Sequence, residues 1–242
     1  MDTARIAALL EPFLEQPLSP SQLDQISTYI DLLLRWNARI NLTAIRHPEE
    51  IVTRHFGESF FLARHLFPKS VARTLLSANP SSAQLPATSP LPEPFAPRVL
   101  DIGSGAGFPA LPLKLWAPHI HLALVESNHK KAAFLREAAR ALTLTNIDVL
   151  TDRAEVLAAR PDFPRAQVVT LRAVEHFAAI LPHAVALLAP GATLALLIGA
   201  AQIPRLTTLT TIKWHPPISV PQSQTRVLSI GIHQKSGIPH AE

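Results

Sequence analysis

The residues with the clearest chemical potential form a loop of three alternating glycines after a short apolar run. The run contains Asp101, and a glycine follows at every second position, at Gly103, Gly105 and Gly107. Glycine tolerates positive φ and lets a ligand approach the backbone closely. Pro109 suits the first turn of a helix, and helix N-terminal amides favour negative charge. The pattern predicts a strand, a tight loop and a helix N-terminus that together bind a nucleotide-like ligand.

The spacing of the glycines separates two classes of nucleotide ligand. The dinucleotide fingerprint needs a glycine at position 108, which Phe108 occupies, so the spacing disfavours a nicotinamide enzyme. The spacing D-x-G-x-G-x-G instead resembles motif I of the class I methyltransferases, which bind S-adenosylmethionine. Glu126 ends a second apolar run about 20 residues further on, where such folds place the acid that accepts two ribose hydroxyls. The alternatives are a structural unit without a ligand, and a solvated Glu126 that caps the next helix.

The composition describes a chain that can bury a full core. It has 242 residues, 48% of them hydrophobic, with a formal charge of +4 and no cysteine. Without cysteine, disulfides, cysteine-ligated metals and a cysteine nucleophile are excluded. No apolar run is long enough to cross a membrane, and the N-terminus lacks a basic-then-apolar signal pattern. We expect a cytoplasmic monomer without a metal or a membrane partner, and the mildly basic charge permits a polyanionic one.

The first of three segments, residues 1–76, is predicted to be helical. Residues 19–22 read Ser-Pro-Ser-Gln, which fits a capping box with proline at the first helical position. A second helix is predicted to start near Pro48, with acids in its first turn. The apolar residues that follow helical spacing after the capping box are Leu23, Ile26, Ile30, Leu33 and Ile40.

The other two segments are a linker or insertion at 77–97 and a Rossmann-like core at 98–242. The linker is rich in proline and serine and holds one charge, Glu93, which favours extended chain. In the core, strands are predicted at 99–102, 122–125, 147–150, 168–171 and 194–198, and helices at 110–116, 130–142 and 175–188. Strands buried on both faces that alternate with helices predict an α/β fold with a mostly parallel, doubly wound sheet. Two last strands, at 212–220 and 226–232, are predicted to close it in antiparallel fashion.

Several short motifs are spread along the chain: Trp36-Asn37, Asn41-Leu42-Thr43, Arg54-His55-Phe56, Glu58-Ser59, the glycine loop through Leu113, Glu126-Ser127, Lys130-Lys131, Phe134-Leu135, Arg153-Ala154-Glu155 and Arg172-Ala173. In combination they resemble the bacterial 16S rRNA guanine-N7 methyltransferases of the RsmG (GidB) family. The similarity covers nearly the whole chain apart from residues 77–97 and the last ten.

The resemblance implies a class I S-adenosylmethionine-dependent methyltransferase fold with an N-terminal helical extension, acting on one guanine in the decoding-region loop of 16S rRNA. The partner is then this RNA, in the small ribosomal subunit or an assembly intermediate. The chain departs from the family pattern at Ile198, where the family usually has lysine, and in its longer proline-rich insertion. Together with the loop, the residues expected to bind the cofactor are Asp101, Gly103, Ser104, Gly105, Gly107, Phe108, Glu126, Ala154, Glu155 and Arg172.

The residue inventory is compatible with methylation at guanine N7. This atom carries an in-plane lone pair, so no proton must leave before attack, and catalysis needs alignment rather than a general base. Attack at pyrimidine C5 uses a cysteine, which this chain lacks. Enzymes that methylate exocyclic amines usually carry an Asn/Asp-Pro-Pro-aromatic motif where Thr170-Leu171-Arg172-Ala173 stands. We assign no catalytic residue, and Arg172 stays open as a candidate.

The basic residues have functional and structural interpretations. Arg172 ends an apolar strand, where a buried cation needs a partner: a carboxylate of the protein, the methionine carboxyl group or an RNA phosphate. A helix at 130–142 carries a basic face that is either an RNA phosphate contact or an ordinary solvated surface, formed by Lys130, Lys131, Arg136 and Arg140. His55 is interpreted as structural rather than catalytic.

Two other functions remain open at this stage. The same fold methylates small molecules or proteins, and fold alone does not exclude them. A non-catalytic, cofactor-binding RNA chaperone is the other alternative.

Overall fold

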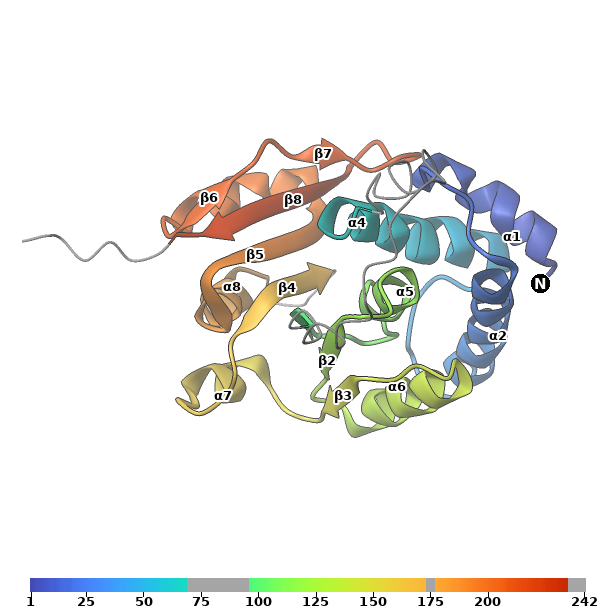
Figure 1. Cartoon of the computed structure of the whole chain (residues 1–242), viewed down its shortest axis with the longest axis horizontal. Coiled ribbons are helices and arrows are strands. Elements are labelled where there is room, and N and C mark those ends of the chain that lie inside the picture. The colour runs from blue at the N-terminus through green and yellow to red at the C-terminus, as the bar shows by residue number, and fades with distance from the viewer. Residues whose placement is uncertain (69–95, 173–176, 235–242) are drawn as a thin grey trace, which may run out of the picture.

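The computed structural model describes residues 1–68, 96–172 and 177–234, and its centre is a mixed β-sheet (Figure 1). The strand order is β3-β2-β1-β4-β5-β8-β6, and β7 pairs with β8. The first five strands run parallel, while β8 is antiparallel to β5, β6 and β7. The strands are β1 Arg98–Ile102, β2 His121–Val125, β3 Ile147–Leu150, β4 Ala166–Arg172, β5 Leu188–Gly199, β6 Ile212–Trp214, β7 Ile218–Ser219 and β8 Arg226–His233.

Helices cover both faces of this sheet (Figure 1). The chain elements beside it are α5 Ala110–Trp116, α6 His129–Ala141, α7 Ala154–Ala159, α8 Phe177–Ala186 and the 3₁₀ segment η4 Ala200–Thr208. Successive strand residues face opposite sides: Leu122 and Leu124 join the core under α5 and α6, whereas Ala123 and Val125 join the core under α7 and α8. The α/β fold with a mostly parallel, doubly wound sheet and antiparallel final strands is thereby confirmed.

The N-terminal helices pack on the α5 and α6 side of the sheet (Figure 1). They are α1 Thr3–Leu10, the 3₁₀ turn η1 Glu11–Phe13, α2 Pro20–Asn37, α3 Pro48–Glu50, the π-helix η2 Ile51–Gly57 and α4 Glu58–Leu66. The predicted capping box at Ser19 and Gln22 is present. Ile40 lies beyond the end of α2, so the predicted helical stripe ends earlier than expected. The π-helical stretch was not predicted, because its sequence follows the same apolar spacing as an α-helix.

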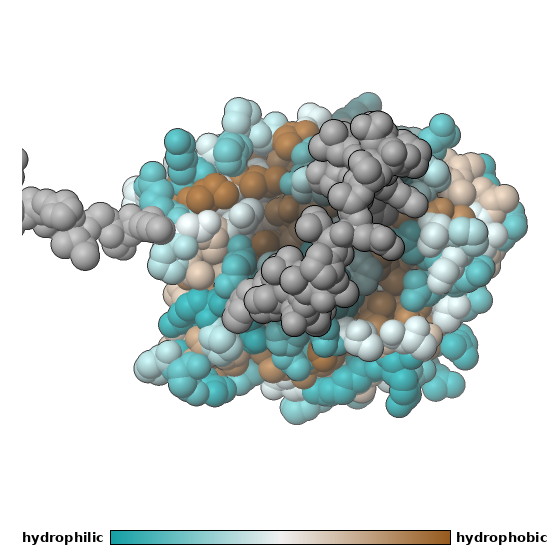
Figure 2. All heavy atoms as spheres, viewed as in Figure 1, coloured by the Kyte–Doolittle hydropathy of each residue, from teal (hydrophilic) through white to brown (hydrophobic). Residues whose placement is uncertain are grey.

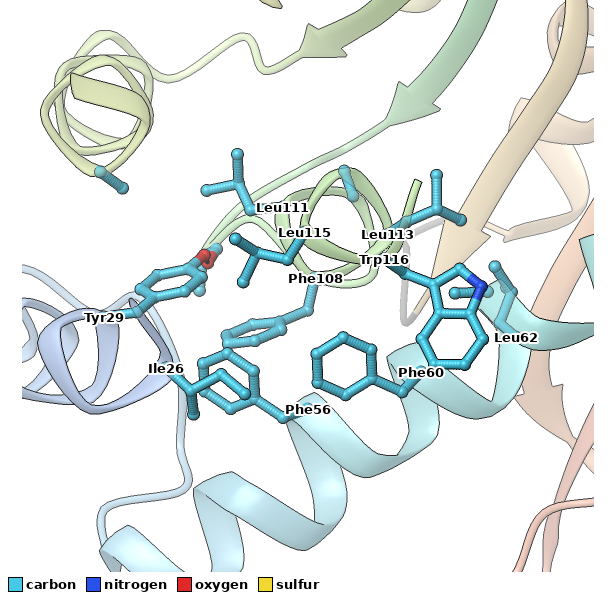
Figure 3. Packing of buried hydrophobic residues seen from close by; sticks show 14 of the residues in the cluster. Ile26, Tyr29, Phe56, Phe60, Leu62, Phe108, Leu111, Leu113, Leu115 and Trp116 are labelled. Carbon is cyan, nitrogen blue, oxygen red and sulfur yellow. Dashed lines mark hydrogen bonds between the residues drawn. The ribbon is translucent and has the colours of Figure 1, made fainter. Parts of the chain in front are cut away.

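Aromatic side chains join the N-terminal helices to the end of the glycine loop (Figure 3). Phe108 follows the loop and its ring is stacked on Tyr29 of α2, with centroids 5.3 Å apart. Phe56 of η2 meets both rings edge-on, at 5.3 Å and 5.1 Å. Phe60 of α4 extends the cluster to Trp116 of α5. The helical segment and the sheet therefore share one core on this side, although the three-segment division of the chain stays a prediction.

Two predicted elements differ from the structure. The helix predicted at 175–188 ends at Ala186, because Leu188 pairs with Ala166 and begins β5, and its first two residues lie outside the described part of the chain. The single strand predicted at 212–220 is two short strands, β6 and β7, separated by Pro216 and Pro217. Proline lacks the N–H that a strand ladder needs, so the pairing with β8 is interrupted there. The predicted linker lies outside the described residues except for Ala96 and Pro97.

The described residues expose few large apolar side chains. Figure 2 shows hydrophilic side chains around the outline of one face and apolar ones nearer its middle. Val156 is the one large apolar side chain found exposed in the described ranges, at 46%. None of the helices described here is both long and apolar enough to span a bilayer.

Candidate nucleotide site

Two adjacent cavities open beyond the carboxyl ends of β1, β2 and β4, the edge where open α/β sheets bind ligands. The first has a volume of about 470 Å³ and extends towards α7 and α8. The second has a volume of about 590 Å³ and extends towards η2 and the loop after α2. Gly103, Glu126 and Ser127 line both, so the two cavities meet at the glycine loop.

The glycine loop has the backbone conformation that its sequence predicts. Gly103, Gly105 and Gly107 have φ values of 70°, 53° and 82°, a region that L side chains rarely adopt. The amides of Gly103 and Ser104 donate to the carbonyl oxygen of Val125, at 2.9 Å and 3.1 Å. These bonds hold the loop against the end of β2, where its backbone lines the cavities.

Glu126 is buried at this junction, with 7% of its surface exposed. Its Oε2 accepts from the amide of Gly105 at 2.9 Å, and its Oε1 accepts from the amide of Asn128 at 2.8 Å. The carboxylate thus fixes the glycine loop as well as facing both cavities. The Asn128 side chain caps α6 by accepting from Lys130 and Lys131, so the alternative of a solvated Glu126 capping that helix does not describe this structure.

Two of the residues expected to bind the cofactor, Asp101 in β1 and Gly107 at the end of the loop, line neither cavity. Asp101 is 1% exposed, and its Oδ1 accepts from the hydroxyl of Thr170 at 2.6 Å. Burial raises the pKa of Asp101 to about 6, against the opposing effect of hydrogen bonds from Thr170 and Ser104. A side chain at Gly107 would collide with the Tyr29 hydroxyl and with Leu111. Gly107 therefore leaves room for the Tyr29 hydroxyl, and Asp101 is buried in the sheet rather than part of a cavity wall.

The first cavity is closed by the turn after β3. Ala154 begins α7 and is 4% exposed, and Glu155 follows it in the cavity wall. The pKa of Glu155 is lowered by its own backbone amide, and Arg153, 3.4 Å away, acts in the same direction. Asp152 from this turn and His183 from α8 also line the cavity. The wall therefore offers backbone and carboxylate groups of the kind that recognise an adenine edge and a ribose.

One wall of the second cavity includes His55 and Phe108, which belong to a stack of three rings. Phe108 lies between Tyr29 and His55, and the His55 centroid is 4.6 Å away with an interplanar angle of 15°. The His55 Nε2 is bonded to the Thr43 hydroxyl at 2.7 Å. Burial, with the nearby charges of Arg172, Arg54 and Arg226, lowers the pKa of His55 to about 2. His55 is therefore neutral at physiological pH and a poor base, which agrees with its structural interpretation.

Arg172 meets a buried carboxylate at the rim of the second cavity. Its Nη2 lies 3.1 Å from Oε2 of Glu58, a side chain that is 2% exposed. The same oxygen lies 3.1 Å from Nε of Arg226. Burial lowers the pKa of Arg172 to about 10, so the group stays charged at neutral pH. Of the partners expected for Arg172, the structure supplies a protein carboxylate, and Arg172 is also among the residues that line the second cavity.

The four basic residues of α6 that were predicted to contact RNA lie in different surroundings. Lys131 lines the second cavity, whereas Arg136 donates to the carbonyl of Val149 at 3.0 Å and to the Thr151 hydroxyl at 2.7 Å. Lys130 and Arg140 are exposed and line neither cavity. The structure therefore brings one of the four predicted RNA contacts to the site.

The sequence comparisons decide the family. A family model described as GidB, rRNA small subunit methyltransferase G, matches residues 22–74 and 87–212. This chain belongs to the GidB family. A relative from Roseiflexus castenholzii, named ribosomal RNA small subunit methyltransferase G, is 39% identical and covers 69% of this chain and 60% of its own length. A relative of the same name from Xanthomonas axonopodis pv. citri is 34% identical and covers 80% of this chain and 79% of its own.

The aligned part of this GidB-family chain thus spans less than two thirds of the Roseiflexus relative. Among solved structures, a SAM-dependent O-methyltransferase from Thermotoga maritima is similar with a TM-score of 0.46 and 13% identity, covering 59% of this chain and 61% of its own. Among the described residues, no group of three or more side chains is arranged to hold a metal ion.

Three residues of this GidB-family site were missed by sequence reasoning as functional candidates. Glu58 belongs to one of the motifs that resemble the family, and an acid within an apolar helical stretch is the sequence feature that could have identified it as functional. Arg226 reaches the site because β8 inserts beside β5, which a local pattern does not reveal. Arg54 lies on the same π-helix as His55 and lines the second cavity. Ile198 is 3% exposed within the sheet core, so this position offers no polar group to a ligand.

Proposed function

We propose that this chain transfers a methyl group from S-adenosylmethionine to N7 of one guanine in the decoding-region loop of 16S ribosomal RNA. Membership of the GidB family and the names of the relatives support the class of reaction and the RNA substrate. We further propose that it acts in the cytoplasm as a monomer, on the small subunit or an assembly intermediate. The shape and the chemistry of the two cavities support the proposed cofactor and acceptor atom.

The residues present fit S-adenosylmethionine. Each Glu126 oxygen already accepts one amide, and a carboxylate oxygen has a second lone pair for a ribose hydroxyl. We assign the adenosine to the first cavity, beside Ala154 and Glu155, and the amino-acid end to the second, beside Gly103 and Arg172. When bound, the cofactor supplies an electrophilic methyl group on a cationic sulfur, and this chain orients it against the acceptor.

The observation that carries the choice of N7 is that the described residues lining the second cavity include no suitable general base. Among the described residues that line it, the groups able to accept a proton are His55 and Glu126. The pKa of His55 is about 2. The oxygens of Glu126 each accept a backbone amide, and we assign their remaining lone pairs to the ribose hydroxyls of the cofactor. An acceptor that must lose a proton fits this cavity poorly, whereas guanine N7 attacks with a lone pair it already has. The contribution of the protein is then alignment of the two reactants.

The proposal is tested with purified chain, labelled S-adenosylmethionine and small-subunit particles from a strain that lacks the enzyme. The expected product is one N7-methylguanine per 16S RNA, identified by nucleoside mass analysis, with none on large-subunit RNA. Label in a protein or a small molecule would support the other methyltransferase class instead. Cofactor binding without transfer to any of these would support a non-catalytic RNA chaperone.

A further inference from the structure

Glu58 is a buried charged side chain beside the second cavity, and it does not line the cavity itself. It is 2% exposed and is the first residue of α4, directly after the π-helix η2. Its Oε2 lies 3.1 Å from Nη2 of Arg172 and 3.1 Å from Nε of Arg226. These two arginines come from the ends of β4 and β8, so one carboxylate joins three elements that are distant in sequence.

The two arginines are held by a single negative charge. Arg54 also approaches Glu58, with Nε 3.6 Å from Oε1, but its guanidinium has a second partner in Glu50 at 3.4 Å. Arg172 and Arg226 share Glu58, so the pair keeps a surplus of one positive charge beside the cavity. The Nη1 atom of Arg172 is buried and has no hydrogen-bond partner in the structure, and the Arg172 side chain is 7% exposed.

A second contact fixes the direction of Arg172. Its Nη2 donates to the carbonyl oxygen of Arg54 at 2.5 Å, which leaves the other side of the guanidinium without a protein acceptor. Arginine binds carboxylates through a planar fork, so a fixed orientation of that fork decides how well an anion is received. Burying a carboxylate together with its cationic neighbours costs desolvation free energy. Apolar side chains at these positions would fill the same space without that cost, so stability alone does not explain the cluster.

We infer that Glu58 is a positioning residue that holds Arg172 and Arg226 as a preformed pair, so that Arg172 receives the carboxylate at the amino-acid end of the cofactor. This rests on the proposed binding of S-adenosylmethionine. Glu58 acts through Arg172 and touches neither ligand. Two physical alternatives make opposite predictions for the neutralisation of Glu58. If Glu58 only balanced charge, its neutralisation would strengthen anion binding. If Glu58 positions Arg172, its neutralisation should weaken anion binding.

The test compares two probes, S-adenosylhomocysteine and adenosine, by calorimetry on the full chain. Glu58→Asp keeps the charge but retracts the carboxylate, and it should raise the dissociation constant of S-adenosylhomocysteine about tenfold, the loss of roughly one charge-assisted hydrogen bond. The dissociation constant of adenosine, which lacks the amino-acid end, should stay within about twofold of wild type. Glu58→Gln should weaken S-adenosylhomocysteine at least as much, and Glu49→Gln, which removes the exposed ion pair with Arg5, is the matched control and should change neither.

A second background shows whether the effect passes through Arg172. In Arg172→Ala, the further change Glu58→Asp should not alter S-adenosylhomocysteine binding, because coupled residues are not additive. Unchanged or tighter S-adenosylhomocysteine binding in Glu58→Asp, or an equal loss for both probes, would overturn the inference. Wild-type chain that binds neither probe would instead refute the proposed cofactor site, so the two failures are distinguishable.

Discussion

Removal of the Glu126 carboxylate tests the cofactor site most specifically. The side chain holds two amides and has lone pairs left for two hydroxyls, each of which would form a charge-assisted bond of about 1.5–3 kcal/mol. Water replaces part of these bonds in Glu126→Ala, since the truncated side chain opens the junction of the two cavities. The net loss of about 1.4–2.8 kcal/mol corresponds to a 10- to 100-fold weaker binding of S-adenosylhomocysteine.

The assay is calorimetry, with Glu137→Ala on α6 as a control that faces neither cavity. The amides of Gly105 and Asn128 lose their acceptor in Glu126→Ala, so a stability loss of about 1–3 kcal/mol is expected as well and is measured by urea unfolding. At saturating cofactor, single-turnover methyl transfer should be largely intact and nearly independent of pH around neutrality. A folded Glu126→Ala that binds with wild-type affinity would refute the site. Transfer that is abolished at saturation, with a wild-type rate that rises with pH, would show a base at work.

Three further predictions address the loop, a buried carboxylate and the basic helix. Gly105→Val should abolish S-adenosylhomocysteine binding. Gly191→Val, within β5 at a φ of 81° and with open space for the added side chain, should carry a comparable strain of roughly 1–2 kcal/mol without affecting binding. Wild-type affinity in Gly105→Val would remove the loop from the site. Because the native pKa of Asp101 is raised from 3.8 to about 6, the folded state binds the extra proton, so its contribution to stability should fall as pH rises between these values. Asp101→Asn should flatten that slope in urea unfolding, and an unchanged slope would contradict it. Lys131→Ala should reduce the slope of log K for RNA binding against log salt concentration by about one. Arg136→Ala should chiefly lower the melting temperature of the protein. The reverse pattern would contradict the placement of these two residues.

The sequence was most informative where local patterns coincide with the pairing of neighbouring strands. Short-range rules predict the ends of β1 and β2 next to Asp101 and Glu126, the glycine loop after β1 and the capping box at Ser19, and the structure has all of them. The end of the helix at Ala186 did not follow, because the pairing of Leu188 with a distant strand outweighs helical spacing.

The arginine–glutamate cluster shows what local reasoning does not reach. Arg172 was expected to need a partner, but three candidates were open, because the sequence alone does not show which anionic group reaches it. Glu58 becomes its neighbour only when α4 packs beside the sheet, and Arg226 joins them only because β8 inserts next to β5. Likewise, the four cations of α6 looked equivalent in sequence, and their separation depends on where β3 and the second cavity lie.

The central claim is methylation at guanine N7, and the most direct test uses the chemical lability of that product. RNA carrying N7-methylguanine is cleaved at the modified nucleotide after borohydride reduction and aniline treatment, so 16S RNA from a strain lacking this chain is compared with RNA from the same strain complemented by wild type or by Gly105→Val. The account predicts one cleavage in the decoding-region loop that is lost on deletion, returns with the wild type and does not return with the variant. A cleavage pattern that is identical with and without this chain would contradict it.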